Sequence, residues 1–363
     1  MAKLSEMFRK MWALGASDLH LGAERKPFFR VDGDLEEVEG YGILGAEEVR
    51  AYLEEIAPVE NWKEFTERWD TDFAYKEDGV GRLRANYFYD INGPGAVFRL
   101  IPSKVITMEE LKLPQGVVNL CHLTKGLVLI TGPTGSGKST TLAAMIDYII
   151  RKRTDHIITI EDPVEFVHES KGCLINHREV HKNTKSFKNA LRAALREDPD
   201  IILIGELRDL ETVEIALEVA ETGHLVFGTL HTTSAYATVD RIIDQFPADK
   251  QSQIRTMLAG ALCGVVSQNL CKRKNKGRVA AFEIMLATTA VFSNIREGKT
   301  FQLPSVIQTG KKAGMKLMNE SLFELVRDGI IEPREAFAKS FDKEDIMRRF
   351  QVGAISFEPD IRP

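Results

Sequence analysis

The clearest chemical signal in the chain is a glycine-rich stretch, Gly132–Ser139, with the sequence GPTGSGKS. It follows an apolar run typical of a strand and precedes a run with helical periodicity. In such a loop, glycines let successive backbone N–H groups converge on a phosphate, and the helix N-terminus adds partial positive charge. We expect Lys138 to contact the β- and γ-phosphates of ATP and the Ser139 hydroxyl to bind Mg²⁺. The expected nucleotide-binding residues are Gly132, Pro133, Thr134, Gly135, Ser136, Gly137, Lys138, Ser139 and Thr140.

Acidic residues follow two other apolar runs that are typical of strands. Glu206 ends the run DIILIGE, at the position of a Walker B acid, with Gly205 where an aspartate usually stands. We expect Glu206 to hold Mg²⁺ through water. Glu161 closes the run HIITIE, and Glu165 follows after a short turn. Either carboxylate could accept the proton of an attacking water, and spacing alone does not choose between them.

Two histidines flank the apolar run LVFGTL. His231 closes this run on the side where the phosphates are expected, where an imidazole can sense or polarise the γ-phosphate. His224 opens the run and is expected at a contact with another domain or subunit. Because the two imidazoles lie at opposite ends of one strand, they cannot share a metal ion.

The elements that must position these residues fall into successive parts of the chain. Apolar runs alternate with helical periods from Leu127 onward, which predicts a parallel sheet covered by helices on both faces. Earlier residues alternate short strand and helix patterns, which predicts a small α+β domain. After about residue 285 the pattern is helical, and residues 352–363 are expected to form an untethered tail. The expected parts are 1–100 (α+β domain), 101–116 (proline-bounded linker), 117–288 (ATPase core) and 289–363 (helical region and tail).

Composition excludes several classes of protein. Of the 363 residues, 44% are hydrophobic and 28% charged, which suits two or three globular domains and excludes a disordered chain. No run approaches the roughly 18 apolar residues that cross a bilayer. The net charge of −5 provides no general attraction to nucleic acid or anionic lipid. The N-terminus lacks the apolar core of a secretory signal, and the 4 cysteines form no C-x-x-C pair, so we expect a cytoplasmic protein with reduced thiols.

Four segments resemble, in order and spacing, the Walker A, Asp, Walker B and His boxes of the secretion ATPases of type II secretion and type IV pili: GPTGSGKST, ITIEDPVEF, ILIGELRDLET and TGHLVFGTLHTTSA. Two further segments, ASDLHL and IREGKTFQLPSVIQTG, are similar to segments of the pilus retraction branch of that family. The resemblance covers nearly the whole chain. Extension and type II secretion members are longer and usually carry a four-cysteine zinc motif, which favours the retraction branch here.

This resemblance implies an architecture and a function. The fold would be an N-terminal PAS-like α+β domain followed by a RecA-like P-loop ATPase domain with a helical C-terminal segment, assembled as a homohexamer with ATP bound between the two domains. The function would be a motor that hydrolyses ATP to retract type IV pili in twitching motility. Its expected partners are the inner-membrane platform protein of the pilus and an accessory retraction ATPase, at the cytoplasmic face of the inner membrane, without membrane insertion and without nucleic acid.

The resemblance also implies roles for single residues. Glu206 matches the Walker B glutamate and Glu165 the catalytic glutamate, with Glu161 as a second candidate. Arg84 and Arg99 match, by position, arginines of the N-terminal domain that reach the γ-phosphate in this family. A guanidinium fork there would offset charge on the transferred phosphoryl group. The turn DINGPG between the two arginines departs from the family pattern, which leaves its contacts open.

Other functions remain open at this point. Within the family these are a pilus extension or type II secretion ATPase and the accessory retraction paralogue. A nucleic-acid translocase is a different class, because RecA-like hexamers often thread DNA and KRKNKGR at 272–278 is a basic cluster. The near-balanced charge disfavours it, and we interpret 272–278 as a solvated turn or a contact with a neighbouring subunit. A regulatory nucleotide-binding module without turnover is the third alternative.

Overall fold

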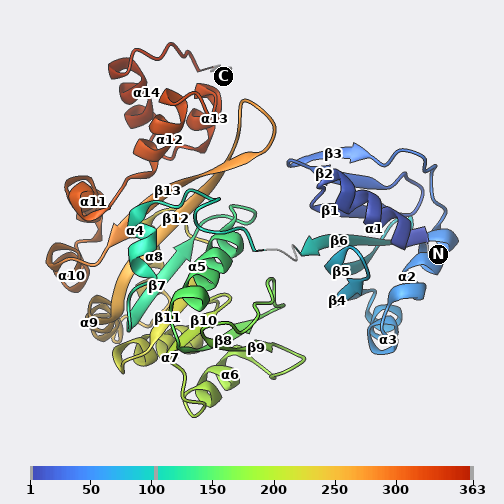
Figure 1. Ribbon diagram of the computed structural model, residues 1–363, viewed down its shortest axis with the longest axis horizontal. Helices are drawn as coiled ribbons and strands as arrows, with labels where there is room; N and C mark the ends of the chain where they lie inside the picture. The colour runs from blue at the N-terminus through green and yellow to red at the C-terminus, as the bar shows by residue number, and fades with distance from the viewer. Residues whose placement is uncertain (1–2, 102–104, 360–363) are drawn as a thin grey trace. The chain divides into compact units, whose positions relative to one another are not determined.

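The computed structural model describes residues 3–101 and 105–359, and the chain divides into two compact units, Met1–Lys104 and Val105–Pro363 (Figure 1). The linker expected at 101–116 falls in part on residues 102–104, which lie outside the described residues. No helix within the described ranges is long and apolar enough to cross a membrane.

The N-terminal unit is an antiparallel sheet with helices packed on it. The strand order is β3-β2-β1-β6-β5-β4. Helix α1 forms because Leu4, Met7, Phe8 and Met11 recur at helical spacing and bury one apolar face in the core of this unit. The bounds are α1 (Lys3–Leu14), β1 (Asp18–Gly22), β2 (Phe28–Val31), β3 (Asp34–Glu37), α2 (Ala46–Ile56), α3 (Val59–Arg68), β4 (Asp70–Glu77), β5 (Gly81–Asp90) and β6 (Gly93–Ile101).

The C-terminal unit is built on a second sheet, in the order β13-β12-β7-β11-β10-β8-β9. Its neighbouring strands are parallel except for the antiparallel pair β12 and β13, a long hairpin drawn in orange in Figure 1. Its strands are β7 (Gly126–Thr131), β8 (His156–Glu161), β9 (Leu174–Glu179), β10 (Ile201–Ile204), β11 (Leu225–Leu230), β12 (Leu262–Lys272) and β13 (Arg278–Leu286). Its helices include α4 (Gln115–Leu120), α5 (Lys138–Lys152), α6 (Phe187–Ala194), α7 (Leu210–Glu221), α8 (Ala235–Asp244) and α9 (Gln251–Ala261).

Both faces of this second sheet are buried. Leu127 and Leu129 of β7 pack into one core with residues of α7, α8 and α9, whereas Val128 and Ile130 pack into another with residues of α5. Alternate residues of a strand point to opposite faces, so a strand covered on both sides must be apolar throughout. The mixed α/β fold class expected from the apolar runs is confirmed. The carboxyl ends of the parallel strands meet at one edge, where the candidate site lies.

The chain ends in a helical region, whose α helices are α10 (Thr289–Arg296), α11 (Leu303–Thr309), α12 (Met318–Arg327), α13 (Pro333–Lys339) and α14 (Lys343–Val352). The expectation of an untethered tail is wrong for the residues that follow α14. The Phe357 ring packs against Phe337 and Phe350, at centroid distances of 5.4 and 5.9 Å. Apolar burial therefore holds this segment on the helices, and residues 360–363 lie outside the described residues.

Candidate active site

The glycine-rich loop connects β7 to α5, as the motif requires. Gly132, Gly135 and Gly137 have φ angles of 141°, 76° and 88°, which side chains rarely allow. A Cβ atom on Gly135 would meet no atom within 4 Å, so its backbone conformation alone favours glycine there. The loop therefore adopts the positive-φ turns that let backbone N–H groups converge on an anion.

Lys138 begins α5 and is nearly buried, at 9% exposure. Its Nζ donates hydrogen bonds to the carbonyl oxygens of Gly132 (2.7 Å) and Pro133 (3.2 Å). Burial lowers the pKa of Lys138, and the negative charges of Glu206 and Glu165 oppose that shift. The structure thus brings together three of the residues that the sequence singled out, around one ammonium group.

The loop also contains a polar group with an unmet hydrogen bond. Ser136 is 3% exposed, and its buried Oγ has no hydrogen-bond partner in the described part of the chain. Buried hydroxyls are nearly always paired, so a ligand oxygen in the loop would complete this one. Ser139 and Thr140 follow in the first turn of α5, half-buried. These donors fit the phosphate chain of a nucleotide.

Glu206 and His231 form a direct contact at the ends of neighbouring parallel strands, β10 and β11. The distance between Glu206 Oε1 and His231 Nε2 is 3.1 Å. The other carboxylate oxygen accepts a hydrogen bond from Nε of Arg208 at 2.7 Å. Sequence reasoning missed Arg208, although its place two residues beyond an acidic strand end was a usable signal. The imidazole of His231 is therefore oriented by the same carboxylate that was expected to hold Mg²⁺.

Glu161 and Glu165 lie together at the end of β8, in different surroundings. Burial raises the pKa of Glu161 to about 7, and the charges of Glu165 and Glu179 contribute to the rise. Its Oε2 accepts a hydrogen bond from the backbone N–H of Glu165 at 3.4 Å. The Glu165 side chain is exposed. The structure brings both candidates to the site and gives them unlike environments.

Arg84 and Arg99 belong to the N-terminal unit, where they are directly opposite each other on β5 and β6. Paired residues on antiparallel strands lie on the same face, so the two guanidinium groups share one surface of the sheet. Nε of Arg84 is 3.5 Å from Asp72 Oδ1, and Nε of Arg99 donates to Asp18 Oδ1 at 2.8 Å. Asp18, from the ASDLHL segment, is itself buried. Sequence reasoning did not find that Asp18 orients Arg99.

Comparison with known proteins gives a consistent family. Residues 2–338 match the family model described as "Type II/IV secretion system protein". The chain is 53% identical over 326 residues to the type IV pilus retraction ATPase PilT of Pseudomonas aeruginosa, covering 90% of this chain and 94% of that protein. It is 50% identical over 321 residues to a twitching motility protein of Neisseria gonorrhoeae, covering 88% and 86%.

A solved structure is similar over nearly the whole chain. The crystal structure of the pilus retraction motor PilT with bound ADP superimposes with a TM-score of 0.86 at 44% sequence identity. The superposition covers 96% of this chain and 100% of that one. The resemblance to the secretion ATPases that the four boxes indicated is confirmed.

Proposed function

The chain belongs to the type II/IV secretion system protein family, and from this premise we propose that it is an ATP-hydrolysing motor that powers the retraction of type IV pili. The observation that carries the proposal is its extensive identity, across nearly the full length of both chains, to a type IV pilus retraction ATPase. The site geometry supports it, because a phosphate loop, a buried lysine and strand-end carboxylates are the parts that phosphoryl transfer needs.

In this proposal each described residue has a chemical task. The loop amides and Lys138 offset phosphate charge, and Glu165 accepts the proton of the attacking water, with Glu161 as the alternative base. Glu206 and His231 act as a pair at the γ-phosphate side. Mg²⁺ supplies further charge neutralisation when bound, and Ser139 and, through water, Glu206 are the residues that would hold it. A phosphate-bound Mg²⁺ needs few protein ligands, which fits this sparse donor set.

The proposal extends to assembly and place of action. We infer a homohexamer with a PAS-like N-terminal domain and a RecA-like ATPase domain, in which Arg84 and Arg99 act on the γ-phosphate. The motor would act at the cytoplasmic face of the inner membrane, on the platform protein of the pilus and beside an accessory retraction ATPase. The family implies these partners.

The first test is Lys138→Ala. Removing the ammonium from the phosphate loop should lower steady-state phosphate release by about a hundredfold or more. Lys152→Ala, an exposed lysine at the other end of the same helix, is the matched control and should keep wild-type turnover. In a piliated strain that lacks this gene, the wild type and Lys152→Ala should restore twitching, and Lys138→Ala should not. Absence of ATP turnover in the wild type, or normal twitching without the gene, would refute the proposal.

A further inference from the structure

Gln268 lies on β12, next to the phosphate loop but 131 positions beyond Gly137 in the chain. Its side chain is buried, at 3% exposure. Nε2 donates a hydrogen bond to the carbonyl oxygen of Ser136 at 2.7 Å, and Oε1 accepts one from Thr141 Oγ1, also at 2.7 Å. Because a carbonyl oxygen can only accept, the contact with Ser136 fixes which end of the amide is the donor. One side chain thus joins the loop to the first turn of the helix that follows it.

The bond to Ser136 has a geometric consequence for the next residue. The peptide group is planar and trans, so the C=O of Ser136 and the N–H of Gly137 point in opposite directions. A carbonyl held toward β12 therefore turns the Gly137 N–H away from β12. In a phosphate loop this amide is one of the donors that must converge on the bound anion.

Contacts with Gln268 also account for two of the motif glycines. A Cβ atom on Gly132 would lie 2.3 Å from the backbone oxygen of Gln268, and one on Gly137 would lie 2.8 Å from its Nε2. Both distances lie below 3.0 Å, a separation that real Cβ atoms essentially never show. The backbone of Gln268 therefore packs against the loop at Gly132, and its side chain packs against the loop at Gly137.

We propose that Gln268 is a positioning residue for nucleotide binding: it holds the Ser136 carbonyl so that the Gly137 N–H is aimed at the phosphates. The inference rests on the proposed ATPase function and adds to it a residue outside the four sequence boxes. The loop amides contact the nucleotide both before and during hydrolysis. A Gly137 N–H that no longer points at the phosphates should therefore weaken the binding of ADP and ATP alike, and it should raise KM more than it lowers kcat.

The neighbouring residue provides a matched control. Ser267 of β12 pairs with Thr131 of β7, and its Oγ forms a buried 2.7 Å hydrogen bond with Thr131 Oγ1. Breaking that bond with Ser267→Ala should lower thermal stability about as much as breaking the Gln268 bond, but it removes no partner from a loop carbonyl. A role confined to stability would make the two variants alike.

The test measures ADP binding by calorimetry, and the kinetics of ATP hydrolysis, on full-length protein. Gln268→Glu keeps the shape and the acceptor for Thr141 but replaces the donor to Ser136 with a second oxygen. Gln268→Met removes the same donor without adding a charge, and it is measured beside Gln268→Glu so that repulsion between a carboxylate and the phosphates is excluded as the cause. We expect the Kd for ADP and the KM for ATP to rise together by about tenfold, with kcat changed less than about threefold, and Ser267→Ala to match the wild type. Thr141→Val removes the hydrogen bond to Gln268 Oε1. It should raise the Kd for ADP and the KM for ATP by about threefold.

The outcomes separate the two proposals. If Gln268→Glu does not fold, Thr141→Val and the near-isosteric Gln268→Met decide the question with the same measurements. Variants that bind ADP as tightly as Ser267→Ala would overturn the role of Gln268 and leave the ATPase assignment intact. A wild-type protein that binds neither ADP nor ATP would instead overturn the proposed function.

Discussion

The two carboxylates at the end of β8 are both candidates for the catalytic base, and they lie in different surroundings. Burial raises the pKa of Glu161 to about 7, a value that suits a general base at neutral pH. Glu165 is exposed, and its charge reaches the ammonium of Lys138. A base must also lie close to the phosphates, and the electrostatic contact with Lys138 favours Glu165 on that ground.

Glu165→Gln should therefore bind ATP with nearly wild-type affinity and hydrolyse it about a hundredfold more slowly, because only proton acceptance is lost. Single-turnover measurement of phosphate release, together with nucleotide binding, distinguishes this from a binding defect. If Glu161→Gln shows that behaviour and Glu165→Gln does not, the two roles are reversed.

Glu161→Gln has its own signature in stability. Folding raises the pKa of this carboxyl, so its protonated form stabilises the folded state. This contribution is fully present below pH 4.5, the pKa in the unfolded chain, and is lost as the pH rises to about 7. The wild type should accordingly lose stability relative to Glu161→Gln between those pH values. Unfolding by denaturant at pH 4.5 and pH 8 measures the difference, and a constant difference would show that Glu161 is not the titrating group.

At the scale of elements, much of the C-terminal unit could be predicted from its sequence. The runs GLVLIT, IITIE, IILI and LVFGTL are mostly apolar, which is typical of strands buried on both faces, and each forms a parallel strand. The phosphate loop could be predicted because its chemistry is local, within eight residues. Strand β9 was missed, because its burial is irregular and its sequence LINHRE is largely polar.

The contacts that hold the site together could not be predicted in the same way. Gln268 meets Ser136 across 132 positions of sequence, and Arg99 meets Asp18 across 81. Such contacts depend on strand order and register, and β12 lies beside β7 only after the sheet has formed. The motif ASDLHL could be matched to a family, but its physical use, a buried carboxylate that binds Arg99, became clear only from the pairing of β1 with β6.

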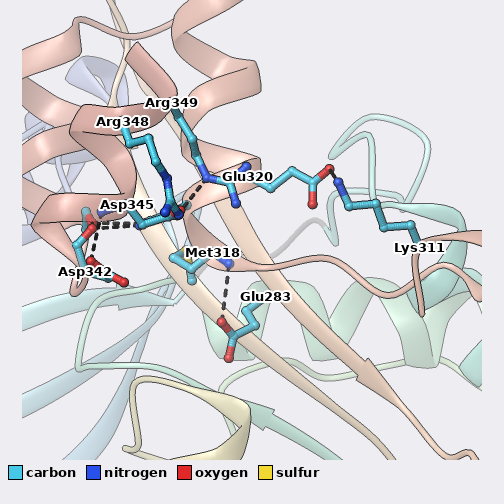
Figure 2. Close-up of polar contacts among 10 residues, drawn as sticks. Glu283, Lys311, Met318, Glu320, Asp342, Asp345, Arg348 and Arg349 are labelled. Atoms are coloured by element: carbon cyan, nitrogen blue, oxygen red, sulfur yellow. Dashed lines mark hydrogen bonds and ion pairs between the residues drawn. The ribbon is translucent and has the colours of Figure 1, made fainter. Parts of the chain in front are cut away.

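Glu283 on β13 joins two helices whose sequences are far apart. Its Oε1 accepts a hydrogen bond from the backbone N–H of Ala235, in the first turn of α8, at 2.8 Å. Its Oε2 accepts one from the N–H of Met318, in the first turn of α12, at 3.3 Å, and Figure 2 shows this contact. Burial raises the pKa of this carboxyl. One buried side chain thus satisfies orphan donors at two helix N-termini, which holds the C-terminal helices onto the ATPase sheet.

Glu283→Ala should destabilise the protein by about 2 to 4 kcal/mol, because two buried N–H groups lose their acceptors. Glu332→Ala is the control: that glutamate forms an exposed ion pair with Lys274, at 3.4 Å, for which we expect a loss below about 1 kcal/mol. Denaturant unfolding of both variants gives the two values. Equal losses would mean that Glu283 does not anchor the helices.

For the whole molecule, the question is whether the N-terminal unit controls chemistry in the C-terminal unit. Every part of the phosphate loop lies in Val105–Pro363, whereas Arg84 and Arg99 lie in Met1–Lys104. If their guanidinium groups stabilise the transferred phosphoryl group, hydrolysis requires both units, while nucleotide binding requires mainly one. Substitutions in the N-terminal unit should then lower the rate of ATP hydrolysis while leaving the affinity for nucleotide nearly unchanged.

Arg84→Ala and Arg99→Ala should each lower kcat by about a hundredfold or more while changing the Kd for ADP little, since ADP lacks the phosphate that they would contact. The two variants separate catalysis from stability, because Arg84 pairs with the exposed Asp72 and Arg99 with the buried Asp18. Only Arg99→Ala leaves a buried carboxylate without this partner, so only its Tm should fall. Arg68→Ala, an exposed arginine of the same unit that pairs with Glu64, should change neither quantity. If kcat falls only in the variant that also loses Tm, the arginines support the fold of the N-terminal unit, and the chemistry belongs to the C-terminal unit alone.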